Sequence, residues 1–177
     1  MLLLIVNIAC KIHQMKNTFY SLVLFFSVFI ALNTQAQSNQ VFTEAIIGVW
    51  EGEGTLFQLK ATFNMKWETN LNDKFINLTF KNSFTGTSGT ETTMSANAYY
   101  HLEQYIGYWF DSRGMILPLT FDINEHSMTV FWGDESTEKG KTIYSIKDNE
   151  HINVQDFVFR DNTYVLFGEA TYKRIKD

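Results

Sequence analysis

The segment of the sequence that most constrains the fold is 48–55, GVWEGEGT, in which large, charged and absent side chains alternate. In a β-strand successive side chains point to opposite faces. Trp50 therefore shares one face with the two glycines that follow it, and both glutamates share the other. Because carboxylates favour water, we expect the tryptophan and glycines to face the interior. A bulky side chain next to positions without side chains is typical of a strand that lines an enclosed space.

The segment 1–36 is expected to be an N-terminal extension followed by a cleaved signal peptide. From Met15 onward, Lys16 supplies a positive charge, residues 19–32 form an apolar run, and small residues end at Ala36, where we expect cleavage. Met15 is therefore the better start. An alternative reading is a lipoprotein that carries its lipid on Cys10.

The apolar run at 19–32 is also shorter than the roughly 20 residues that a membrane-spanning helix needs. The sequence thus predicts export to the periplasm or the medium as a secreted protein of the cell envelope. It predicts no stable membrane span once the signal is removed.

The remaining segment 37–177 has the length of one domain. It holds 19 acidic residues and 12 basic ones, because Lys11 and Lys16 leave with the signal, so its formal charge is −7. An acidic domain without a basic stripe is a poor candidate for nucleic-acid binding. The single cysteine, Cys10, lies in the leader, so this exported domain must be stabilised by burial of its many aromatic side chains.

After a short helical turn expected within 38–47, the chain shows only short β-rich runs divided by turn signals. We expect ten strands at 49–59, 62–70, 74–82, 91–101, 104–111, 115–123, 127–132, 141–146, 152–159 and 163–175. Short links favour antiparallel neighbours. The predicted fold is all-β: a closed, antiparallel, up-and-down β-barrel of about ten strands, in which closure removes the sheet edges. A two-sheet sandwich is the alternative, and Pro118 predicts a bulge or an edge in the sixth strand.

The motif Gly48-x-Trp50 at the start and Lys173-Arg174 at the end resemble the signature of the calycins, the lipocalin-like superfamily. The segments 48–54, 105–112 and 168–174 are also similar to a family of uncharacterised, secreted bacterial lipocalin-like barrels, and the opening motif is distantly similar to that of nitrobindins. The resemblance implies that an Arg or Lys of the last strand packs on the tryptophan of the first. It also implies an internal cavity for a small, mostly apolar molecule.

Alternation assigns inward positions on the first and last strands to Trp50, Gly52, Gly54, Leu166, Gly168, Ala170, Tyr172 and Arg174. Small residues on one wall leave volume unless large neighbours such as Trp67 fill it. The candidate ligand-binding residues are Trp50, Trp67, Tyr100, Tyr105, Trp109, Tyr172 and Arg174. The partner they predict is a small hydrophobic molecule. Ile106, Tyr108 and Phe110 are expected to form an exposed apolar strip on the outer surface.

No cofactor, metal ion or catalytic group is expected. His101, His126 and His151 fall on a polar face or in turns, so haem, which needs an inward axial ligand, is the less favoured choice. Asp134, Glu135 and Glu138 lack the ligand spacing of a dedicated calcium loop, and Asp111 with Arg113 is expected to stabilise a turn.

The function that these patterns favour is a non-enzymatic, exported binding protein with a hydrophobic ligand inside the barrel. One alternative is a cell-envelope interaction or structural module that uses the aromatic strip. A lipid-processing enzyme is a further alternative, and it requires an inward acid or base that the pattern does not identify.

Overall fold

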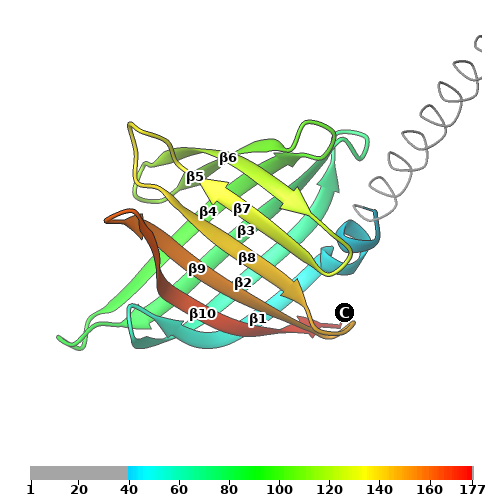
Figure 1. Cartoon of the computed structure of the whole chain (residues 1–177). Coiled ribbons are helices and arrows are strands. Elements are labelled where there is room, and N and C mark those ends of the chain that lie inside the picture. Colours follow the sequence, from blue (N-terminus) through cyan, green and yellow to red (C-terminus); the bar gives the residue numbers. More distant parts are fainter. Residues whose placement is uncertain (1–39, 177) are drawn as a thin grey trace, which may run out of the picture. The chain divides into compact units, whose positions relative to one another are not determined.

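The computed structural model describes residues 40–176, so the expected signal peptide lies outside the described part of the chain. A short helix at 40–46 precedes a closed, ten-stranded antiparallel barrel (Figure 1). The strands are β1 (Gly48–Leu56), β2 (Leu59–Asn70), β3 (Phe75–Thr85), β4 (Glu91–His101), β5 (Ile106–Asp111), β6 (Ile116–Ile123), β7 (Ser127–Trp132), β8 (Gly140–Ile146), β9 (His151–Arg160) and β10 (Thr163–Ile175). The all-β closed barrel and the N-terminal helical turn are thus confirmed.

Closure occurs between the first and last strands. β1 pairs with β2 on one side and with β10 on the other, and each strand in between pairs with its neighbours in the chain. In the β1–β10 register, Trp50 lies opposite Arg174 and Gly54 lies opposite Ala170. Along β2, buried and exposed residues alternate from Ala61 to Trp67, so the inner face is apolar and the outer face is polar. Up-and-down closure leaves no unpaired edge.

The first hairpin turn lies earlier than the sequence predicts. β1 ends at Leu56 and β2 begins at Leu59, and the two turn residues, Phe57 and Gln58, have φ of 51° and 66°. A two-residue turn with positive φ at both positions matches the twist of antiparallel strands. Such turns usually contain glycine or asparagine, so this one carries no sequence signal. The turn at Asp161 and Asn162 has the same geometry and was predicted correctly.

The prediction that Leu166 faces inward is wrong. The β9–β10 register shifts between Leu166 and Gly168, which leaves Leu166 46% exposed, while the ring of Phe167 packs against the core. A β-bulge adds one residue to one strand and so reverses the alternation beyond it. The inward positions that alternation assigns along this strand from Arg174 are therefore correct only back to Gly168.

Pro118 produces no register shift in β6. It pairs with Tyr108 of β5, and its carbonyl accepts a hydrogen bond from the N–H of Gly133, just beyond the last β6–β7 pair at Leu119 and Trp132. The N–H and C=O groups of a strand residue point to the same side, so Pro118 would direct an N–H toward β7. The paired residues of β6 and β7 begin only at Leu119, so the missing N–H of Pro118 removes no hydrogen bond between paired strand residues.

Candidate ligand-binding interior

One end of the barrel is closed by the helix and the Trp50–Arg174 pair. The guanidinium of Arg174 lies 4.1 Å from the centroid of the Trp50 ring, as predicted. Arg174 also donates hydrogen bonds to the carbonyl oxygens of Ile47 and Ala45, each at 2.6 Å, and to that of Asn149 at 2.9 Å. The Trp50 indole N–H donates to the carbonyl of Ile46 at 2.8 Å. These two side chains therefore satisfy the last carbonyls of the helix, which have no partner within it.

The half of the interior next to this end is filled by aromatic side chains. The Trp67 ring lies 5.4 Å from that of Tyr100 and 5.3 Å from that of Tyr144, between centroids, and Tyr100 packs edge-on against Phe121. Trp50, Trp67, Tyr100 and Tyr172 have almost no exposed surface. We conclude that this half is a packed core.

The small residues of β1 do not leave the volume that the sequence suggests. A Cβ on Gly52 would lie 2.7 Å from Cδ1 of Tyr172, and one on Gly54 would lie 2.6 Å from Cα of Ala170. Gly52 thus accommodates the Tyr172 ring, and Gly54 allows β10 to approach closely. The expectation that this wall contributes empty space is wrong, because the neighbours across the strand pair occupy it.

The half of the interior away from the helix differs in exposure. Several inward-facing side chains there are only partly buried: Phe80, Met94, Trp109, Trp132, Asp156 and Val158. These positions alternate with outward-facing residues, and Phe80, Trp109 and Trp132 also pack against the core, with the Phe80 and Trp109 ring centroids 5.7 Å apart. The interior is therefore fully buried at the helix end and only partly buried at the opposite end, which we call the accessible half.

An inward carboxyl group lies in this accessible half. Asp156 of β9 accepts a hydrogen bond from the Thr142 hydroxyl of β8 at 2.6 Å. Protein atoms are densely packed around the carboxyl group, although the residue as a whole is only partly buried. Burial raises the pKa of Asp156 to about 6, and the Thr142 hydrogen bond only partly offsets this.

Asp156 is not among the residues predicted from the sequence, although the alternation that places it inside is visible there. Ile152, Val154 and Asp156 are spaced two apart on one strand, and the first two are buried. The same alternation that assigns the apolar residues to the interior also places the carboxyl group there.

Three tyrosines lie within electrostatic range of this carboxyl group. Burial raises the pKa of Tyr100, Tyr144 and Tyr172, and the negative charge of Asp156 raises each further. A side-chain hydrogen bond links Tyr100 to Tyr144. The interior thus holds hydroxyl groups that stay protonated and can donate hydrogen bonds.

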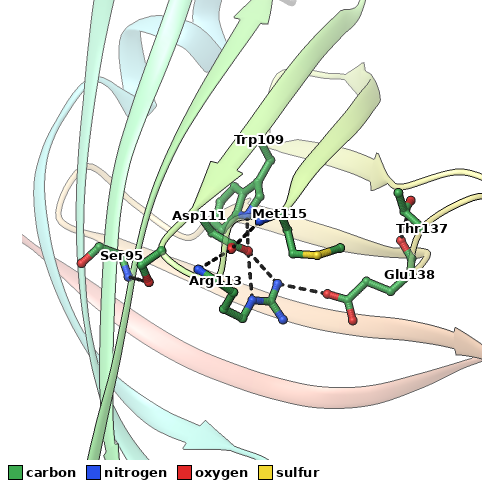
Figure 2. A network of polar contacts seen from close by, with 8 residues as sticks. Ser95, Trp109, Asp111, Arg113, Met115, Thr137 and Glu138 are labelled. Carbon is green, nitrogen blue, oxygen red and sulfur yellow. Dashed lines mark hydrogen bonds and ion pairs between the residues drawn. The ribbon is translucent and has the colours of Figure 1, made fainter.

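A polar network lies at the accessible end (Figure 2). The Trp109 indole N–H donates to Oδ2 of Asp111 at 3.1 Å, and the Arg113 guanidinium bonds the same oxygen at 2.6 Å and Oε1 of Glu138 at 3.0 Å. Burial acts to raise the pKa of Asp111, but bonds from Arg113, Trp109 and the backbone together hold it below its ordinary value. The predicted turn-stabilising role of Asp111 is confirmed, and the network fixes the Trp109 ring.

The seven candidate ligand-binding residues thus occupy different places. Trp50 and Arg174 close the helix end, whereas Tyr105, with φ of 56°, lies in the turn before β5 and packs on Phe121. Trp67, Tyr100 and Tyr172 belong to the packed half, and Trp109 alone contributes to the accessible half.

His101 and His151 contact neighbouring side chains, and the acidic loop has hydrogen bonds of its own. His101 packs edge-on against Phe75, and the His151 ring lies 3.0 Å from a carboxylate oxygen of Asp148. Asp134 accepts hydrogen bonds from Ser136 within the acidic loop. Over residues 40–176, no group of three or more potential ligands could hold a metal ion. No helix in that part of the chain is long and apolar enough to cross a bilayer.

Comparison with known proteins supports the fold. No protein-family model and no curated protein matches the sequence. Among solved structures, the chain is similar to an S-type phycobiliprotein lyase from Guillardia theta, with a TM-score of 0.51 and 10% identity over 79% of this chain and 94% of that one. This similarity, together with the closed ten-strand barrel, supports a lipocalin-like, calycin-type fold. Such a barrel is compatible with binding of a hydrophobic ligand.

Proposed function

We propose that this protein is an exported, non-enzymatic binding protein that holds a small hydrophobic molecule inside its barrel, and that it belongs with the secreted lipocalin-like barrels it resembles. The observation that carries the proposal is the difference between the two halves of the interior. One half is a closely packed aromatic core, and in the other Phe80, Trp109 and Trp132 face inward but are only partly buried. Aromatic side chains that face inward but stay partly uncovered are the lining that an apolar ligand needs.

Asp156 is the inward ionisable group that an enzyme in this barrel requires, yet its surroundings favour binding. The titratable groups that interact with it are tyrosines, and burial raises their pKa values. They remain hydrogen-bond donors near neutral pH and do not act as bases or nucleophiles.

The test measures binding of N-phenyl-1-naphthylamine, a neutral apolar dye that fluoresces when it leaves water. We expect saturable, one-site binding by the wild type. Val158→Trp, which enlarges an inward side chain of the accessible half, should abolish it. Phe159→Trp, one residue further along β9 on the outer face, is the matched control and should bind normally. Absence of dye binding by the wild type, or equal binding by both variants, would overturn the proposal.

Native mass spectrometry of the protein from its own host provides a second readout. We expect an additional mass of a few hundred daltons, the size of a ligand that pockets of about 300–1,000 Å³ enclose. The mass should be absent from the Val158→Trp variant.

A second candidate function is a cell-envelope interaction module, and the outer face of β5 favours it. Tyr108 is 53% exposed and lies opposite Tyr99 of β4, while Phe110 pairs with Ile116 of β6, which is 59% exposed. The predicted strip is confirmed and extends over three strands. Clustered aromatic residues on an outer face are typical of partner surfaces.

Substituting Tyr108→Glu and Phe110→Glu together tests this alternative, since both side chains lie outside the core. The interaction module predicts that a protein co-purified with the wild type is lost, with the fold and the dye binding unchanged. Retention of that protein by the double variant would exclude a role for the strip.

A further inference from the structure

The inward carboxyl group of Asp156 indicates the chemical class of ligand that the barrel binds, and this inference rests on the binding function proposed above. Asp156 lacks a cationic partner within residues 40–176: only burial and the Thr142 hydrogen bond influence its pKa. The carboxylate at the rim, Asp111, differs because Arg113 neutralises it. A buried charge without a counter-ion is costly, so a site that retains one gains strongly from a ligand that supplies the opposite charge.

The geometry leaves one carboxylate oxygen of Asp156 available. Thr142 donates to Oδ1, and no hydrogen bond to Oδ2 is present in the described part of the chain. Oδ2 lies 3.1 Å from the place where a Cβ on Gly168 would stand, and Leu56 Cδ1 lies 3.2 Å from the same point. Any larger residue at 168 would crowd Oδ2. The absence of a side chain at 168 therefore makes room for Oδ2 of Asp156 next to Leu56.

The surroundings of Asp156 favour a cation. Tyr144 of β8, Tyr172 of β10 and Tyr100 of β4 are the titratable groups that interact with it. No lysine or arginine acts on it from these strands. The three tyrosines stay neutral and supply no counter-charge, so a cation is the group that this site lacks.

We propose that the barrel binds hydrophobic molecules that carry a protonated amine, with the ammonium group at Oδ2 of Asp156 and the apolar body along Phe80, Trp109 and Trp132. An amine supplies both the charge and the N–H donors that Oδ2 lacks. The accessible end admits the molecule, and the packed half limits its length.

The experiment uses three probes of equal chain length that differ only in the head group: octylamine, 1-octanol and octanoate. Each displaces N-phenyl-1-naphthylamine from the protein at pH 8. We expect octylamine to compete about ten- to a hundredfold better than octanol, the factor that a charge-assisted hydrogen bond supplies. Octanoate should compete least, because its charge is that of Asp156.

Asp156→Asn is the diagnostic variant, since the amide keeps the shape and can still accept the Thr142 hydrogen bond. It should reduce octylamine affinity to that of octanol and leave octanol unchanged. Glu169→Gln is the matched control: it removes a carboxylate from the outer face of the adjacent strand, where Glu169 accepts a hydrogen bond from Gln155. This variant should keep the amine preference.

Lowering the pH provides a further readout. Because the pKa of Asp156 is about 6, the wild type should lose its amine preference between pH 7 and pH 5. Asp156→Asn should show no such change, since octylamine stays protonated throughout.

The outcomes separate the two proposals. If the dye does not bind the wild type, the binding function fails and this inference fails with it. If the dye and octanol bind but octylamine has no advantage, or if Asp156→Asn keeps the advantage, the binding function stands and the amine assignment is overturned.

Discussion

Replacing Asp156 by asparagine should make the protein more stable at neutral pH and leave its stability at acidic pH nearly unchanged. Burial raises the pKa of Asp156 from 3.8 to about 6 in the folded protein. The folded state thus favours the protonated form. The stability contributed by that form is fully present below pH 3.8, declines as the pH rises and is lost above about pH 6.

The magnitude follows from the two pKa values. Their difference of about 2.2, multiplied by about 1.36 kcal/mol per pH unit, gives about 3 kcal/mol. The free energy of unfolding of Asp156→Asn minus that of the wild type should therefore rise by about 2.4 kcal/mol between pH 4 and pH 7, since the rest of the change lies below pH 4. Other carboxylates titrate in this range too, but they do so in both proteins and cancel in the difference.

The assay is urea unfolding of ligand-free protein, followed by tryptophan fluorescence, at half-unit pH intervals from 4 to 8. Glu169→Gln is the control, because it removes a carboxylate from the outer face of the neighbouring strand. A difference curve for Asp156→Asn that stays flat would show that the carboxyl group is well solvated, and it would refute the burial on which the amine proposal depends.

Three further substitutions test other parts of the structure. Arg174→Met should lower the free energy of unfolding by about 3 kcal/mol in urea titrations, since it removes three hydrogen bonds to backbone carbonyls and the stacking on Trp50. Arg174→Lys should recover only part of that loss, because an ammonium group cannot reproduce the planar guanidinium. Gly52→Ala should cost about 1–3 kcal/mol, because its Cβ would overlap the Tyr172 ring; an unchanged melting temperature would contradict the close packing there. Asp111→Asn should lower stability by about 1–3 kcal/mol at pH 7 and progressively less in acid, since a depressed pKa contributes stability that is lost as the pH falls.

The fold could be predicted because its main determinants are local. Alternation of apolar and polar residues identified the strands, and three of them, at 91–101, 127–132 and 163–175, have the expected bounds. The pairing of first and last strands followed from Trp50 and Arg174. The turn at Phe57 and Gln58 escaped prediction because its positive φ values are imposed by strand twist and not by glycine or asparagine.

The site could be predicted only in part, because it depends on distances across the barrel. Alternation shows that Gly52 faces inward, but the register of β10 decides that Tyr172 occupies the space beside it. Alternation likewise places Asp156 inside. Its raised pKa and the room at Gly168 arise only when β8, β9 and β10 lie side by side.

The sequence by itself determined an all-β barrel, because period-two patterning is a property of neighbouring residues, and the resemblance of its two ends to the calycin signature indicated the tryptophan–arginine closure. Tertiary structure alone decided which half of the interior is filled and which carboxyl group is desolvated. Packing and dielectric environment are set by residues far apart in the chain, so no local pattern encodes them.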